Sequence, residues 1–217
     1  MGRDVPSERG APPIEDATAA GDISQEDLSR AGVYALLAKA LIEPLSDDTL
    51  TLVRGLEDET DDSDLGRALQ SLGALAVRTP TVKAEQEYSE LFFGLGAGGE
   101  MTPYGSFYKT GFVYEKPLAD LRQDMTELGI ERSGETSEPE DHIATLCEIM
   151  HGLITGAFGA PATLARQREF FHKHLATWAG QFFEDLEGAD AAVLYMPLGT
   201  VGKLFMTVEA EAFEMAA

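Results

Sequence analysis

The chain has 217 residues, with 16 Lys and Arg against 38 Asp and Glu, a formal net charge of −22 and a single cysteine, Cys147. An excess of carboxylates this large repels phosphate backbones and anionic lipid headgroups. It excludes a nucleic-acid binder and a basic membrane-surface protein, and it favours a cationic partner. A lone cysteine cannot form an internal disulfide, which fits a reducing cytoplasm. No run approaches the ~20 apolar residues of a membrane span, so we expect no membrane insertion.

The chain divides into a tail and one domain. Residues 1–23 mix proline, glycine and carboxylates without apolar periodicity or a signal-peptide core, which predicts a flexible acidic N-terminal tail. The remaining residues, 24–217, are enough to bury roughly 70% of their unfolded surface in one core. We therefore expect a single folded domain over residues 24–217.

Apolar residues recur at helical spacing throughout this domain. Ser24 and Asp27 form a capping box that predicts a helix ending at Pro44, and Ser46 is expected to cap a short second helix. The same spacing predicts further helices over residues 65–76, 79–92, 118–128, 137–153, 161–188 and 198–213. Because no alternating strand pattern of useful length is present, we predict an all-α fold of about eight or nine helices.

Several helix ends carry specific predictions. Thr79 is expected as an N-cap with Pro80 as the first residue of its helix. Ser137 and Glu140 form a second capping box. One long helix is expected to follow Pro161 without interruption as far as Gly188.

One glycine pattern resembles a nucleotide site. Gly94, Gly96 and Gly99 spell the G-x-G-x-x-G fingerprint, in which glycines let the backbone approach a pyrophosphate. The run before Gly94 is helical, and Pro103 follows within a few residues, so a strand–turn–helix unit has no room. We expect a loop between helices here instead.

A carboxylate-bridged di-metal site is the alternative function that the residues themselves raise. Glu148 with His151 and Glu169 with His172 are both Glu-x-x-His pairs, the unit that di-iron helical bundles repeat on two helices. The glycine- and proline-containing segment between the pairs is too short for the further helix that such a site needs. Solvated helix faces are the preferred interpretation, and neither a cofactor nor a catalytic constellation is expected.

Aromatic and acidic residues gather at the expected element boundaries. Tyr88 and Phe92 lie one helical turn apart, the predicted loop 103–108 carries three aromatic residues, and residues 138–142 place carboxylates at a helix start. Crowding of this kind at connections is typical of a binding site. Core packing is the alternative for Tyr88 and Phe92, and complementing the helix dipole is the alternative for Asp141.

Three motifs occur in order in this region, and they are Tyr88-x-x-Leu91-Phe92, Pro103-Tyr104-Gly105-Ser106 and Glu138-Pro139-Glu140-Asp141-His142. In these motifs the chain resembles the TorD/DmsD/NarJ family of redox-enzyme maturation proteins, with its aromatic-x-x-Leu-Phe helix, Pro-aromatic-Gly-Ser loop and Glu-x-x-Asp-His signature. Tyr104 stands where some members have Trp. The run FFHKHLATWAGQFFEDL over residues 170–186 is similar to the family's C-terminal helices, so the resemblance spans roughly residues 24–217.

The resemblance implies a cytoplasmic, system-specific chaperone and not an enzyme. It would bind the twin-arginine signal peptide and the immature body of a molybdopterin oxidoreductase subunit during cofactor insertion, before export, as a monomer or dimer. The residues expected to contact the peptide or client are Tyr88, Leu91, Phe92, Pro103, Tyr104, Gly105, Ser106, Phe107, Glu138, Pro139, Glu140, Asp141 and His142. Carboxylates among them would meet the two arginines and aromatic residues the apolar segment, while His142 orients its neighbours.

The charge also predicts a response to salt. With a net charge of −22 spread along every expected helix, self-repulsion opposes the compact state at low ionic strength, which favours a salt-rich cytoplasm as the source. At 1 M salt the Debye length falls to about 3 Å, so distant repulsions are screened. We expect the thermal unfolding midpoint to rise between 0.1 M and 2 M potassium chloride. A flat or falling midpoint would remove the salt-adapted interpretation.

Overall fold

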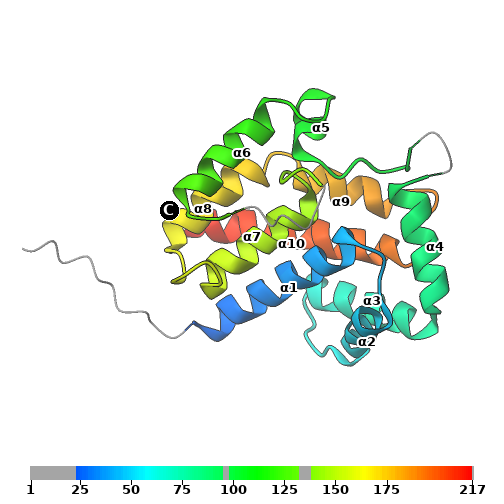
Figure 1. Cartoon of the computed structure of the whole chain (residues 1–217). Coiled ribbons are helices and arrows are strands. Elements are labelled where there is room, and N and C mark those ends of the chain that lie inside the picture. Colours follow the sequence, from blue (N-terminus) through cyan, green and yellow to red (C-terminus); the bar gives the residue numbers. More distant parts are fainter. Residues whose placement is uncertain (1–22, 95–97, 132–137, 217) are drawn as a thin grey trace, which may run out of the picture.

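The computed structural model describes residues 23–94, 98–131 and 138–216, and these form ten α-helices and one 3-10 turn with no named strand (Figure 1). The all-α prediction is therefore confirmed, while the expected tail lies almost wholly outside the described residues. The helices are α1 Gln25–Ile42, α2 Asp47–Arg54, α3 Asp64–Arg78, α4 Thr81–Phe92, α5 Gly105–Thr110, α6 Lys116–Glu127, α7 Ile143–Thr155, α8 Leu164–His174, α9 Ala179–Glu187 and α10 Tyr195–Met215, with the 3-10 turn at Gly55–Asp58.

The predicted caps explain where the first helices begin. Ser24 Oγ accepts a hydrogen bond from the Asp27 backbone N–H at 3.0 Å and donates to the Asp27 carboxylate, as a capping box requires of its first residue. Ser46 Oγ accepts from the Thr49 N–H in the same way. The α4 prediction is one residue early, because Pro80 occupies the N-cap position and Thr81 begins the helix.

The expected long helix after Pro161 is wrong, because the chain breaks between α8 and α9. The apolar stripe continues through the break, and Leu175 and Trp178 are both buried. The indole N–H of Trp178 donates to the His174 carbonyl at 2.6 Å, which satisfies a free C=O at the end of α8. Because of this hydrogen bond, the chain can turn after α8 while Trp178 stays buried.

The region expected to be a loop at residues 103–108 is also different, since α5 begins at Gly105 within it. The break after α8 and this short helix account for ten described helices where the sequence predicted eight or nine. The capping box that begins at Ser137 lies outside the described residues, and α7 begins later, at Ile143. His142 is the N-cap there, and its Nδ1 accepts from the Ala144 N–H at 3.1 Å.

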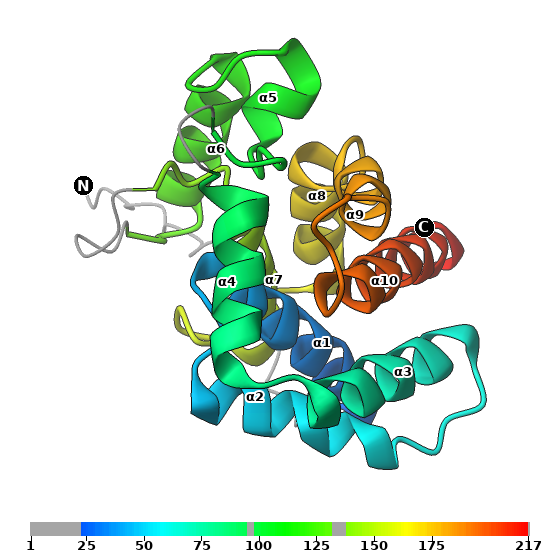
Figure 2. The same ribbon diagram turned by 90° about the vertical axis from the view of Figure 1, so that its right-hand side faces the viewer.

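The core is built by central helices that are far apart in sequence. α1 packs along α7, and α10 packs along α9 and crosses α3 (Figure 2). Between α1 and α10, the Arg30 guanidinium donates to both oxygens of the buried Glu209 carboxylate at 2.7 and 2.9 Å. The Tyr34 hydroxyl donates to the same carboxylate at 2.9 Å.

None of the described helices is long and apolar enough to cross a membrane.

Helix α4 is tied to the start of α10 by one buried carboxylate. Glu87 accepts hydrogen bonds from the backbone N–H groups of Val193, Leu194 and Tyr195 at 2.7, 3.0 and 2.7 Å. These N–H groups open the last helix and have no intrahelical partner, so a carboxylate both satisfies them and complements the helix dipole. Glu87 therefore fixes α4, which carries the Tyr88 motif, against the core.

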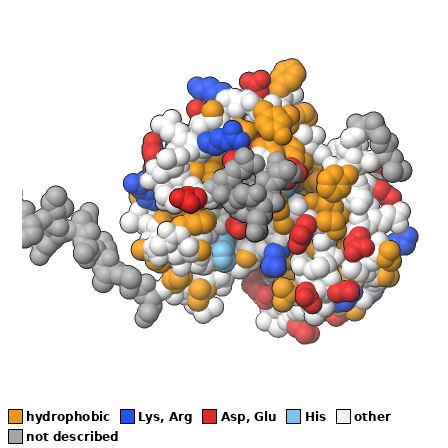
Figure 3. All heavy atoms as spheres, in the orientation of Figure 1, with side chains coloured by type: hydrophobic (Ala, Val, Ile, Leu, Met, Phe, Trp, Pro, Cys, Tyr) orange, Lys and Arg blue, Asp and Glu red, His pale blue; other side chains and the backbone are white. Residues whose placement is uncertain are grey.

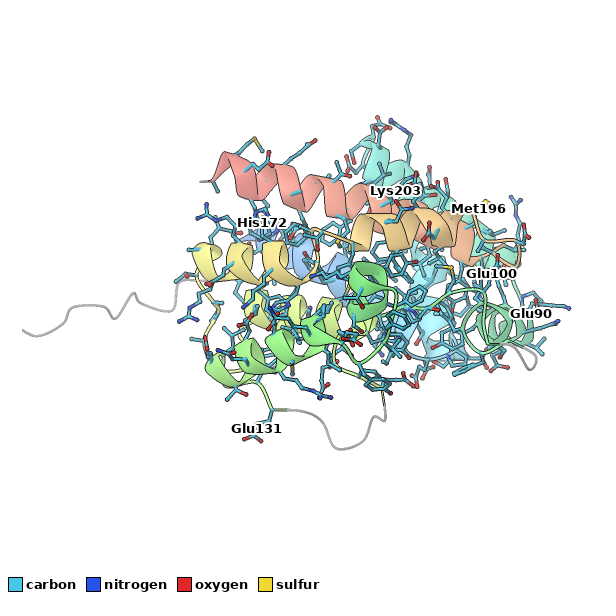
Figure 4. All side chains as sticks on the ribbon, turned by 90° about the horizontal axis from the view of Figure 1, so that it is seen from above. Glu90, Glu100, Glu131, His172, Met196 and Lys203 are labelled. Atoms are coloured by element: carbon cyan, nitrogen blue, oxygen red, sulfur yellow. The ribbon has the colours of Figure 1, made fainter. Side chains whose placement is uncertain are left out.

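This contact gives the first structural prediction. Glu87→Ala leaves the buried N–H groups of Leu194 and Tyr195 and the part-buried N–H of Val193 without this acceptor, and we expect it to lower the free energy of unfolding by about 3 kcal/mol. Glu90→Ala removes an equal charge from the exposed surface of the same helix (Figure 4) and should change it by less than about 0.5 kcal/mol. Urea titrations of both variants test the difference. An equal decrease in the free energy of unfolding of both variants would show that the Glu87 hydrogen bonds add nothing to stability beyond the effect of its charge.

Candidate functional site

Two of the sequence motifs meet in the folded chain. The segments 103–106 and 138–142 pair through an antiparallel bridge between Tyr104 and His142. The Gly105 N–H donates to the Asp141 carbonyl at 2.9 Å, and the Ile143 N–H donates to the Pro103 carbonyl at 2.9 Å. These two backbone hydrogen bonds form the bridge and join the segment before α5 to the start of α7.

The Asp141 carboxylate closes this joint. It is only 3% exposed, and its Oδ2 accepts a hydrogen bond from the Ser106 N–H at 2.7 Å, in the first turn of α5. Among the described residues, neither Asp141 Oδ1 nor Ser106 Oγ has a hydrogen-bond partner. A buried carboxylate that is only half satisfied adds little to stability, which is typical of a residue kept for function. The sequence did not anticipate this burial.

Glycine at position 105 is required by close packing. A Cβ there would lie 3.1 Å from the ring of Trp178, which forms the floor beneath the joint. The sequence analysis gave Trp178 no part in the site. The signal that could have identified it is a tryptophan at a helix break, where its N–H needs a nearby carbonyl.

The two glutamates of the third motif have different environments. Glu140 is buried, and its Oε2 accepts from the Arg122 guanidinium on α6 at 2.8 and 2.9 Å. Glu138 is half-buried, and it accepts a hydrogen bond from the Tyr104 hydroxyl. Arg122 is a site residue that the sequence analysis missed, and its signal was a cation on a helix otherwise rich in acidic and apolar residues.

His142 is held neutral in this site. Burial lowers its pKa from 6.5 to about 4, because the apolar surroundings disfavour the imidazolium. Its ring contacts Tyr104 edge-on, with ring centroids 5.3 Å apart. Since Nδ1 accepts from the Ala144 N–H, a proton on that nitrogen would break the cap of α7.

An aromatic residue of α4, Tyr88, lies near Glu138. Tyr88 is buried, its hydroxyl donates to the Leu41 carbonyl at 3.3 Å, and its ring centroid is 4.7 Å from that of Phe92. Burial, together with the nearby Glu138 and Glu43 carboxylates, raises the pKa of Tyr88 to about 12. Core packing, the alternative interpretation, therefore applies to Tyr88. Phe92 is half-buried and remains partly accessible.

Burial divides the thirteen predicted site residues into two groups. The residues accessible at least in part are Phe92, Tyr104, Phe107 and Glu138. The buried residues are Tyr88, Leu91, Pro103, Gly105, Ser106, Pro139, Glu140, Asp141 and His142. The accessible group comes from three different segments, so only the tertiary fold assembles this face.

The di-metal alternative is wrong. No three His, Cys, Asp or Glu side chains of the described residues form a group that could hold a metal ion. His151 Nδ1 lies 3.0 Å from the Ala31 carbonyl, and the His172 ring lies near Phe213 of α10 (Figure 4). Both histidines are therefore used in packing between helices.

A separate groove lies away from the motifs. It has a volume of about 770 Å³ and an apolar lining from α1, α3 and α10, including Leu36, Leu69 and Val208. None of the thirteen predicted site residues lines it.

Comparison with known proteins gives a consistent relationship. A family model described as "Nitrate reductase delta subunit" matches residues 58–184. "Chaperone protein TorD" of Vibrio cholerae is 26% identical over 195 residues, covering 82% of this chain and 88% of the relative. TorD of Photobacterium profundum is 27% identical over 180 residues, covering 74% and 83%. A structure described as a redox enzyme maturation protein from Archaeoglobus fulgidus has the same fold, with a TM-score of 0.56, 20% identity and coverage of 82% and 93%.

The buried His142 predicts a pH dependence of stability. Because its pKa is about 4 in the folded chain and 6.5 in the unfolded chain, the unfolded chain binds more protons between these values. Its stabilising contribution is fully present above pH 6.5 and is lost as the pH falls to 4, by up to about 3 kcal/mol.

His142→Asn is the matched control, since asparagine caps a helix without titrating in this range. The difference in unfolding free energy between the two proteins should move in favour of the variant as the pH falls from 7 to 4. Parallel pH profiles would mean that His142 is accessible to protons in the folded chain.

Proposed function

The chain belongs to the nitrate reductase delta subunit family, which is the TorD/DmsD/NarJ family of redox-enzyme maturation proteins, and from this premise we propose that it binds the twin-arginine signal peptide of a molybdopterin oxidoreductase. The chain is a maturation chaperone and not an enzyme, as its relatives named TorD chaperones indicate. We place its action in the cytoplasm, on the immature client before export.

One observation carries the proposal, and it is the half-buried Glu138 carboxylate beside aromatic rings. The Tyr104 hydroxyl donates to it, Tyr88 of α4 lies near enough for the carboxylate to raise its pKa, and the Phe92 ring contacts that of Tyr88. A twin-arginine peptide presents two guanidinium groups followed by an apolar stretch. Carboxylate–guanidinium hydrogen bonds are stronger than neutral ones, and aromatic faces also attract arginine, so this face matches that ligand in both respects.

The buried residues of the motifs support this face without touching the ligand. Asp141 and Gly105 hold the two segments together, and Arg122 neutralises Glu140. In this scheme Glu138 is the carboxylate that meets an arginine, whereas Asp141 is a positioning residue. Loss of Asp141 would then weaken peptide binding by displacing α5 and Tyr104.

The charge of the whole chain supports the same assignment. A net charge of −22 attracts a cationic peptide at a distance and raises the association rate at low salt. In a concentrated salt solution this attraction is screened, and direct contacts at Glu138 and the aromatic rings determine the affinity.

Glu138→Gln tests the proposal. It keeps the size of the side chain and one acceptor oxygen but removes the charge, and we expect roughly tenfold weaker binding of a synthetic twin-arginine signal peptide. Isothermal titration calorimetry at 0.15 M salt measures the affinity. A peptide with both arginines replaced by lysines should bind the unaltered protein more weakly, because lysine cannot form the bidentate pair. For the same reason, Glu138→Gln should reduce the affinity for this peptide by a smaller factor.

Glu131→Gln is the matched control, since it removes one exposed carboxylate in the segment that follows α6 (Figure 4). It should leave the affinity within about twofold of the original. Equal effects of the two variants would indicate that only net charge matters and that Glu138 makes no direct contact. No binding of the peptide by the unaltered protein would refute the proposed function.

A further inference from the structure

The chain between α5 and α6 exposes an unusual concentration of apolar side chains. Phe112 is 69% exposed and Tyr114 68%, with Phe107 and Val113 at 38% each. We name residues 107–114 the aromatic turn. Figure 3 shows apolar side chains gathered at the top of the molecule, over α5 and this turn. A cluster of this kind, in contrast to single exposed apolar residues, is typical of an interaction surface.

The aromatic turn has a defined conformation. Gly111 ends α5 in the left-handed region, with φ of 84°. The Thr110 hydroxyl donates to the Ser106 carbonyl at 2.8 Å and accepts from the Phe112 N–H at 3.2 Å. These contacts hold the backbone so that the rings project outward and do not collapse onto the helix.

Tyr114 adds a second indication. Among the described residues it is the only one other than glycine with a positive φ, at 64°. A side chain with a Cβ is strained in this region, and glycine or asparagine would adopt it more easily. Because the Tyr114 ring is largely exposed, packing within the chain does not offset the strain. Strain of this kind is typical of sites that contact a partner.

The aromatic turn is continuous with the proposed peptide site. Tyr114 lies close enough to Tyr104 to raise its pKa, after the larger effects of burial and of Glu138, and the Tyr104 hydroxyl donates to Glu138. Phe107 lies on α5, three residues after Tyr104. The accessible rings of Phe107 and Tyr114 therefore lie near Tyr104, which binds the Glu138 carboxylate.

We propose that the aromatic turn binds the apolar segment of the signal peptide whose arginines meet Glu138. This inference rests on the proposed function. The arginines and the apolar segment belong to one short chain, which spans at most ~3.5 Å per residue, so the apolar surface must lie beside the carboxylate. The aromatic turn meets that condition. Contact between its rings and an uncharged segment buries apolar surface, which stabilises the complex at any salt concentration.

Helix α4 offers a competing surface. Phe93, at the end of α4, is 62% exposed, and its ring centroid is 5.8 Å from that of the buried Tyr88. It is a single exposed ring in an ordinary right-handed conformation. The aromatic turn has two rings of similar exposure and a strained backbone, which is why we assign the apolar segment to it.

Two variants test the inference by independent routes. Tyr114→Asn removes the ring and places at this φ a residue that tolerates it, so the melting temperature should stay unchanged or rise while peptide affinity falls roughly tenfold. Phe112→Ser should lower the affinity to a similar extent without destabilising the fold. Leu52→Ser, at a side chain 65% exposed on α2, is the matched control and should leave the affinity unaltered.

A second peptide completes the test. Its arginines are kept and its apolar segment is replaced by serines, so the unaltered protein should bind it about as weakly as Tyr114→Asn binds the original peptide. Tyr114→Asn and Phe112→Ser should bind the serine peptide no more weakly than the unaltered protein does, because the contact is already lost.

The outcomes separate the two proposals. Undiminished affinity of both turn variants for the original peptide, with Glu138→Gln still impaired, would overturn the aromatic-turn inference alone. A loss on Phe93→Ser with none on the turn variants would move the apolar segment to α4 and also overturn it. Failure of the unaltered protein to bind either peptide would overturn the proposed function and this inference together.

Discussion

The hydrogen bond from the Ser106 N–H to the Asp141 carboxylate is the constraint on which the accessible face depends. It joins the first turn of α5 to the residues that precede α7, although 35 positions separate the two in sequence. The backbone bridge between Tyr104 and His142 runs beside it. With both contacts formed, Tyr104 has one position relative to Glu138, and its hydroxyl can bind that carboxylate. Without them, a short helix such as α5 has little intrinsic stability to hold its place.

A shortage of cations shapes how this chain buries its acidic groups. Only 16 Lys and Arg are available for 38 Asp and Glu, so few buried carboxylates can have a guanidinium partner. Glu209 and Glu140 have one each, in Arg30 and Arg122. Glu87 and Asp141 instead accept from backbone N–H groups at helix starts. Helix N-termini supply the positive potential that the side chains lack, which lets an acidic surface coexist with a well-connected core.

The site separates support from recognition. The buried members of the motifs, such as Gly105 over Trp178 and His142 at the α7 cap, fix the backbone. The accessible members, Glu138, Tyr104 and the aromatic turn, are the residues that we propose contact the ligand. This division matches the demands of peptide binding, in which a preorganised surface loses less conformational entropy on association than a mobile one.

Periodicity and cap chemistry were enough to predict the helical class and the starts of α1 and α2, because the i, i+3 and i+4 spacing and a serine cap act within one or two turns of chain. The break at Trp178, the helix at Gly105 and the burial of Asp141 could not be predicted in this way. Each depends on contacts between segments that are far apart in sequence. The Trp178 indole packs against Gly105, and the Asp141 carboxylate accepts from the Ser106 N–H at the start of α5. The motifs identified candidate site residues from the sequence, but only the fold decided which of them are accessible, since burial is a property of packed helices and is not encoded in any single segment.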